Sequence, residues 1–372
     1  MKKYLVLIVL FFCILQGLYS QIFPEDYNSR MDSTYSEGEI FLNLQASSWF
    51  YNNEYFNPFY KGYTLIGGSF QPKIVYQSNS KLTLMAGADF HRNYGKNENL
   101  FIKPLLSIEY KPTTNFSVLV GSYNGGMNHL LPEALFSFEN HLQDIVEQGI
   151  LIRFSNSRIK TETWLNWESF IEPGDTFREA FTAGSSNRIL VFEKNSLKLS
   201  IPLNLIAHHA GGQINNNDEK VETLINANEG VRLEYNFQPK NRITLYSEFN
   251  LFQATGDYKT KNGKATSINL GMQSNHFELN AEYFQGNNFV CFAGNPILNR
   301  AYSIPMDLSD PFYFENKKMF NLKTGYRQKI GPNSFLFLRF ESYYFLDAKS
   351  LDYSYSLHLQ AQDFLRIFNL KR

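Results

Sequence analysis

Cysteine is almost absent from the 372-residue chain, which has two. Cys13 lies in an apolar N-terminal stretch, and the other cysteine is Cys291. If the N-terminal stretch is removed on export, no internal disulfide and no cysteine-based metal site can form. An exported chain without disulfides fits a bacterial envelope protein better than a small secreted eukaryotic one.

Long hydrophobic runs and an excess of one charge are also missing. After residue 20 no segment approaches the roughly 18 uncharged apolar residues of a membrane-spanning helix. The 35 basic and 35 acidic residues cancel, so nothing indicates a nucleic-acid partner. A mean hydropathy of −0.32 still permits a membrane β-barrel, because only every second strand residue need be apolar.

The N-terminus is typical of an exported protein. Lys2 and Lys3 precede an apolar stretch at 5–15, and Leu18 to Ser20 offers a cleavage site, so residues 1–20 are predicted to be a signal peptide. Residues 21–38 are polar and are expected to form a periplasmic tail. Residues 39–372 are then predicted to form the barrel.

Strict alternation of apolar and polar residues fills most of the chain. In the predicted strand around 336–346, Leu338 and Phe340 alternate with Arg339 and Glu341. A period of two places alternate residues on opposite faces of a sheet. An apolar face beside a charged face indicates lipid outside and water inside. The 34 phenylalanines and 23 tyrosines fit aromatic girdles at the membrane interfaces.

Two classes of connection alternate between the predicted strands. About seven short turns rich in Ser, Asn, Pro, Gly and Lys alternate with about eight longer loops. We therefore predict an all-β, transmembrane, antiparallel up-and-down barrel of about 16 strands, with a range of 14–18. Short turns are expected on the periplasmic side and long loops outside.

In signal peptide, strand number and loop asymmetry the chain resembles a general outer-membrane porin. Segments 130–133, 164–168 and 177–179 also resemble uncharacterised outer-membrane barrels of Bacteroidota, which bring no activity with them. The resemblance implies the bacterial outer membrane as location and its lipid as a partner. Homo-oligomer formation stays open.

The third long loop, 124–146, is expected to fold into the lumen, as the third loop of porins does. Pro132 suits the first position of a short helix. Its polar residues predicted to face the passage are His129, Glu133, Glu139, His141 and Asp144. The basic residues predicted to face them from the wall are Lys103, Arg153, Arg232, Arg242, Lys323 and Arg339. The acidic residues predicted to line the lumen are Glu109, Glu162, Glu248, Glu282 and Glu341.

Opposed rings of charge filter solutes in a pore. The first hypothesis is therefore a porin-like channel for passive diffusion of small hydrophilic solutes, with no enzymatic activity and no cofactor. Alternatively, the charges pair with each other and fill a closed lumen. Such a plugged barrel would present loops 210–229 and 286–316 to a glycan or protein. Trp49 and Trp164 are candidates for sugar stacking.

A lipid hydrolase at the rim is the third hypothesis. Ser185, Ser186 and His208 are candidates, but no Gly-x-Ser-x-Gly elbow is present and no spacing aligns a nucleophile with a base. His208 and His209 point to opposite faces of a strand and cannot bind one metal ion. The histidines and glutamates of loop 124–146 fit no metal-ligand spacing, so no metal site is predicted.

Overall fold

The computed structural model describes residues 37–57, 60–95, 100–124, 129–214, 220–237, 243–256, 262–303, 312–314 and 316–370. The predicted signal peptide, most of the predicted tail and Arg242 lie outside these ranges. Among the described residues no helix has the length and apolar character needed to cross a membrane.

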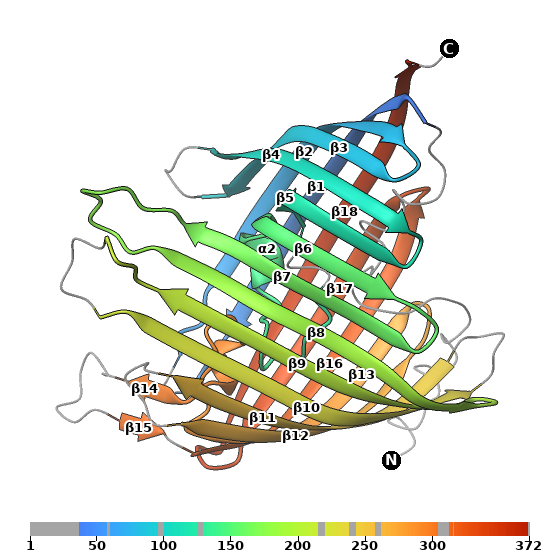
Figure 1. Cartoon of the computed structure of the whole chain (residues 1–372). Coiled ribbons are helices and arrows are strands. Elements are labelled where there is room, and N and C mark those ends of the chain that lie inside the picture. The colour runs from blue at the N-terminus through green and yellow to red at the C-terminus, as the bar shows by residue number, and fades with distance from the viewer. Residues whose placement is uncertain are drawn as a thin grey trace.

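Sixteen antiparallel strands close into a barrel, with β1 paired to β18 (Figure 1). The predicted fold class is confirmed. The first eight barrel strands are β1 (Glu39–Glu54), β2 (Thr64–Asn79), β3 (Leu82–Asn93), β4 (Phe101–Thr113), β5 (Phe116–Tyr123), β6 (Glu147–Ser155), β7 (Ile159–Ser169) and β8 (Ala180–Lys194). The other eight are β9 (Leu197–Ala210), β10 (Glu222–Phe237), β11 (Ile243–Gly256), β12 (Gly263–Gln273), β13 (Phe277–Asn287), β16 (Asn316–Gly331), β17 (Ser334–Phe345) and β18 (Ser350–Asn369). Strands β14 (Ala301–Ser303) and β15 (Phe312–Phe314) form a separate two-stranded sheet.

Alternation along the strands sorts side chains between the lumen and the outer surface. In β17, Arg339 and Glu341 are buried inside, whereas Leu338 and Phe340 are 40% and 42% exposed. The other strands follow the same two-residue period, which gives the barrel an apolar outer band. Fold and pattern together place the chain in the outer membrane.

Aromatic rings gather on the outer surface at the long-loop end of β7, β8 and β9. Trp167 stacks on Phe181 with ring centroids 5.3 Å apart, and Phe181 stacks on His209 at 4.9 Å. Such rings suit the boundary between lipid and water. Trp167, on the outer surface, is therefore in a position that suits contact with the lipid boundary.

Two loop segments fill the lumen towards the long-loop end, and we call them the plug. The first is 129–146, which contains helix α2 (Asn140–Gln143), and the second is 288–299, which contains the 3-10 helix η2 (Pro296–Leu298). Figure 1 shows α2 inside the barrel, behind β6 and β7. The plug and the wall share one hydrophobic cluster, whose members include Leu135, Phe136, Phe289, Ile297, Leu298, Trp164, Phe252, Phe284, Met319 and Phe345.

The helix expected to begin at Pro132 does not form. Residues 133–135 make a turn, and α2 is the α-helical turn of the described part of this loop. The backbone groups that a longer helix would use form hydrogen bonds with the other plug segment instead. The Ser137 amide donates to Ala293 O at 2.7 Å, and Glu133 O accepts from the Asn295 amide at 2.8 Å.

Candidate functional site

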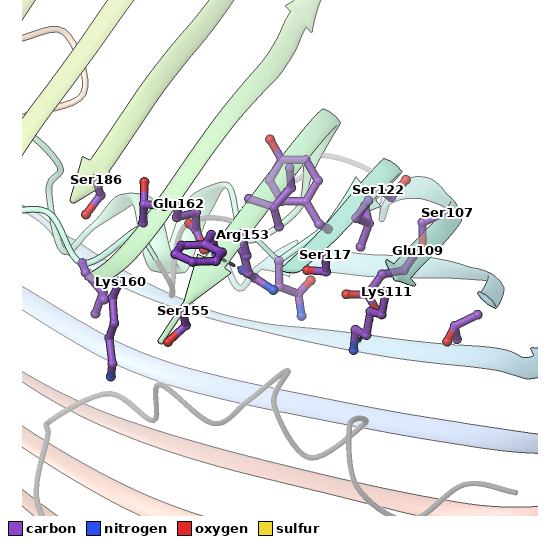
Figure 2. Close-up of a pocket in the computed structure, with 18 of the residues that line it drawn as sticks. Ser107, Glu109, Lys111, Ser117, Ser122, Arg153, Ser155, Lys160, Glu162 and Ser186 are labelled. Carbon is purple, nitrogen blue, oxygen red and sulfur yellow. Dashed lines mark hydrogen bonds and ion pairs between the residues drawn. The ribbon is translucent and has the colours of Figure 1, made fainter. Parts of the chain in front are cut away.

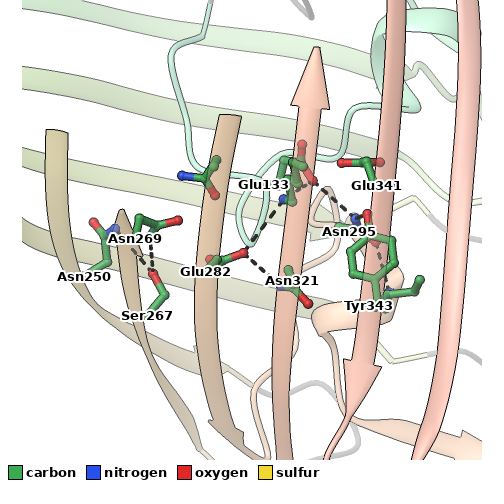
Figure 3. A network of polar contacts seen from close by, with 12 residues as sticks. Glu133, Asn250, Ser267, Asn269, Glu282, Asn295, Asn321, Glu341 and Tyr343 are labelled. Atoms are coloured by element: carbon green, nitrogen blue, oxygen red, sulfur yellow. Dashed lines mark hydrogen bonds and ion pairs between the residues drawn. The ribbon is translucent and has the colours of Figure 1, made fainter. Parts of the chain in front are cut away.

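Glu133 fastens the plug to the barrel wall. Its carboxylate accepts from Lys323 of β16 at 2.7 Å and also bonds to Arg339 of β17. Arg339 in turn bonds to Glu341 at 2.5 Å, and Figure 3 shows Glu133 from the plug among the wall residues. Burial alone would raise the pKa of Glu133, but Arg339 and Lys323 outweigh it and hold the pKa below its ordinary range.

His129 makes a second attachment on the opposite wall. Its Nδ1 lies 2.6 Å from Glu162 and its Nε2 lies 3.0 Å from Glu147. Its ring stacks on Trp164 with centroids 3.6 Å apart. Burial alone would lower the pKa of His129, but Glu147 and Glu162 raise it to about 9. His129 is therefore a cation clamped between two carboxylates, and this arrangement is unsuited to a general base near neutral pH.

The other predicted lumen charges pair mostly within the wall. Loop residue Asp144 reaches Lys103 at 3.2 Å, whereas Glu139 bonds to Tyr63 and Gln143. The pairs within the wall are Arg153–Glu162 (2.7 Å), Arg232–Glu248 (2.9 Å), Lys323–Glu282 (3.8 Å) and Glu109–Lys111 (3.2 Å). Burial, with Arg339 nearby, lowers the pKa of His141 to about 3, so this residue carries no charge. The structure thus brings the predicted charges together as pairs rather than as two rings facing across a passage.

The two tryptophans proposed for sugar stacking are buried. Trp49 is 2% exposed and Trp164 is 3% exposed. His129 covers one face of Trp164, and His91 lies 5.3 Å from Trp49. The expectation of a sugar platform at these residues is corrected, because neither indole presents a face to solvent.

A hydroxyl, an imidazole and a carboxylate meet at the long-loop end of β7, β8 and β9. Thr182 Oγ1 donates to Glu168 Oε1 at 2.5 Å and lies 3.2 Å from His208 Nδ1. The same His208 nitrogen lies 3.5 Å from Glu168 Oε2. Phe292 of the plug stacks on the His208 ring at 3.4 Å and fixes its plane. We call Thr182, His208 and Glu168 the rim cluster.

Of the three hydrolase candidates, only His208 lies in the rim cluster. Ser185 points outward, with its hydroxyl 3.1 Å from Thr163 Oγ1. Ser186 lies further along β8, opposite Asn204 rather than His208. Thr182 and Glu168 were missed because the sequence does not reveal which residue of β8 lies opposite His208.

Among the described residues no group of three or more His, Cys, Asp or Glu side chains has a metal-binding arrangement. A family model described as lipid A 3'-O-deacylase-type matches residues 31–370. The chain belongs to this lipid A 3'-O-deacylase-type family. Because the family is named for an enzyme, the expectation that the chain has no enzymatic activity is wrong.

Solved structures similar to this lipid A 3'-O-deacylase-type barrel are outer-membrane proteins. The trimer form of Vibrio cholerae OmpT is 8% identical, with 88% of this chain and 100% of that chain covered and a TM-score of 0.50. Pseudomonas aeruginosa OccK2 (OpdF) is 9% identical, with 90% and 100% covered and a TM-score of 0.50. Likeness at this identity shows the porin-type fold alone. No curated protein matches the sequence, and none of these findings bears on the Bacteroidota resemblance.

Proposed function

We propose that this protein hydrolyses an ester-linked acyl chain of a lipid A-type glycolipid at the outer end of its barrel. The observation that carries the proposal is the contact between Thr182, His208 and Glu168. Family membership supports the substrate class. The rings of Trp167, Phe181 and His209 on the outer surface of the same strands suit contact with a lipid whose acyl chains lie in the outer leaflet.

The rim cluster supplies the groups that acyl transfer requires. In the resting structure the Thr182 hydroxyl donates to Glu168, and its hydrogen turns to His208 Nδ1, 3.2 Å away, for the reaction. Thr182 Oγ1 then attacks the ester carbonyl while His208 Nδ1 takes its proton, and the imidazolium returns that proton to the leaving alcohol. Glu168 stabilises the imidazolium from 3.5 Å. Water, deprotonated by His208, then releases the acyl chain from Thr182 as a free fatty acid. The hydroxyl is thus regenerated for the next turnover.

Fatty-acid release from lipid A in mixed micelles, measured by mass spectrometry on the folded protein, tests this function. Loss of a general base typically lowers the rate by about 10²–10⁴-fold, so the rate of fatty-acid release by His208→Ala should fall by that factor. His209→Ala is the matched control, because His209 points outward and bonds to Thr223 Oγ1 and Gly211 O. Thr182→Ser should retain turnover and Thr182→Val should lose it. No release by the wild type would reject the function, and full activity of His208→Ala would reject the site.

Passive diffusion of small hydrophilic solutes is the second candidate function. Two lumen cavities of about 370 and 310 Å³, both lined by charged side chains, favour it. The hydrophobic cluster of the plug opposes it. Planar-bilayer recordings decide: stepwise conductance would support diffusion, whereas a silent wild type that conducts after deletion of 129–146 would support a plugged barrel. Cross-linking in the same membranes would show whether the chain forms a homo-oligomer.

A further inference from the structure

The larger lumen cavity, of about 370 Å³, lies on the short-turn side of the plug. Its lining includes Lys111, Ser155 and Lys160, which lie next to the short turns joining β4 to β5 and β6 to β7. Figure 2 shows these side chains with Arg153, Glu162 and Ser186 around the cavity. We call this cavity the vestibule; the rim cluster is not part of it.

Two cations face each other across neighbouring strands of the vestibule wall. Lys160 of β7 is paired in register with Arg188 of β8, and both line the vestibule. Like charges directly opposite each other on one face of a sheet are destabilising. Within the part of the chain that the structure describes, neither side chain has an acidic partner. An anion placed between them would relieve this repulsion.

Arg153 offers a third group to such an anion. Its Nε donates to Glu162 at 2.7 Å, but its Nη2 is buried and has no hydrogen-bond partner among the described residues. A buried donor without a partner is costly, and a bound oxygen would satisfy it. Guanidinium groups bind phosphate and carboxylate through paired hydrogen bonds.

The remaining lining indicates more than a bare inorganic ion. Ser107, Ser117, Ser155 and Ser186 bring hydroxyls to the vestibule, while Leu119, Leu151 and Phe154 add apolar surface. The volume lies within the range of roughly 300–1,000 Å³ of small-molecule sites. We propose that the vestibule binds a small hydroxylated dianion, a sugar phosphate or a hydroxylated dicarboxylate, between Arg188, Lys160 and Arg153. The serines then bond to its hydroxyl groups.

Isothermal titration calorimetry on the folded protein in detergent, in Tris chloride at low salt, tests the proposal. The probes are glucose 6-phosphate, tartrate, inorganic phosphate and glucose. Glucose 6-phosphate or tartrate is expected to bind tightest, and the stronger of the two identifies the anionic group. Phosphate or glucose binding as tightly as both would overturn the proposal, because charge and hydroxyls would then not act together.

Variants separate a ligand role from a structural one. Arg188→Ser is expected to weaken binding by about tenfold or more, because it removes a charge-assisted contact. The thermal midpoint of the unliganded variant should stay constant or rise, because the repulsion from Lys160 is removed. A fall in both affinity and midpoint would mark Arg188 as structural and overturn the proposal.

Lys198→Ala is the matched control. Lys198 lies at the same end of the barrel, 2.9 Å from Glu193, and is not among the vestibule residues. Its removal should leave probe affinity unchanged. If Lys198→Ala weakens binding as much as Arg188→Ser, the probes respond to general charge at the barrel mouth and the proposed site is wrong.

Discussion

The His129 imidazole lies flat on the Trp164 indole, with ring centroids 3.6 Å apart and planes 13° from parallel. The Glu162 carboxylate pairs with Nδ1 of the same imidazole and also accepts a hydrogen bond from Arg153 Nε. A loop residue is thereby joined to the wall by stacking and by charge together. This contact and the one at Glu133 hold opposite sides of the plug against the wall, and the hydrophobic cluster packs the plug further against the strands.

The attachment at His129 should weaken as pH rises. The pKa of His129 is raised from 6.5 to about 9 by its two carboxylates, against the effect of burial. Because the pKa is higher in the folded state, protonated His129 stabilises the folded protein. This contribution is complete below pH 6.5 and is lost as the pH rises through about 9. Hydrogen exchange of residues 129–146, corrected for the intrinsic rate, should therefore show lower protection at pH 10 than at pH 6. In His129→Gln this pH dependence should disappear; equal protection at both pH values in the wild type would refute the mechanism.

The Glu133 contact should contribute more to stability than a half-buried glutamate of the same loop that has no ion pair with the wall. Glu133→Gln leaves Lys323 and Arg339 without their loop carboxylate, and breaking a buried pair costs about 3–5 kcal/mol. Glu139→Gln, which alters contacts to Tyr63 and Gln143, should change stability by about 0.5 kcal/mol or less. Thermal unfolding in detergent compares the two variants. Equal midpoints would show that Glu133 does not anchor the plug.

The side of the barrel on which a strand residue lies could be predicted from the sequence, because it follows from the polarity of that residue's own side chain. Leu338 and Arg339 differ in polarity, and the barrel turns them to opposite sides. The rim cluster depends instead on register between strands. Counting back from the turn at Asn195 pairs Lys194 with Leu197 and would place Ala183 opposite His208; an irregularity between Leu190 and Phe192 brings Thr182 there instead. A shift of one residue in the pairing of β8 with β9 changes which β8 side chain lies beside His208. Nothing in the local sequence reveals the irregularity that causes this shift.

The plug could be predicted in part. The resemblance to porins, whose third loop folds into the lumen, predicts the inward position of Glu133 and His129. Their partners were not, because Glu133 meets Arg339 from a strand 206 residues further along the chain. Segment 288–299 is not predicted inside the lumen, although its buried apolar residues Phe289, Ile297 and Leu298 were a signal for it. Its contacts to the first segment also run through backbone groups such as Ala293 O. Backbone pairing between distant loops leaves no pattern in the sequence.

Gly184 should be required by the position of Trp164. The two residues are paired in register, and a Cβ at Gly184 would overlap the indole ring. Overpacking of this kind costs about 1–3 kcal/mol, so Gly184→Ala should lower the thermal midpoint. Ala183→Val adds bulk to the outer face of the same strand and should change stability by about 0.5 kcal/mol or less. In Gly184→Ala/Trp164→Leu the cost should be less than the sum of the single changes; simple additivity would show that the two residues do not collide.

Cys291 should report on the plug directly. Its Sγ donates to Leu135 O at 3.3 Å, which links the two plug segments, and burial raises the pKa of the thiol to about 12. Only the thiolate reacts, so maleimide labelling at pH 7 should be about 10³-fold slower than in the urea-unfolded chain. Glu133→Gln should accelerate labelling by exposing the thiol, whereas Glu139→Gln should leave the rate unchanged. Cys291→Ser supplies the background rate. Rapid labelling of the folded wild type would mean that the two segments separate in solution and that the lumen is not held closed.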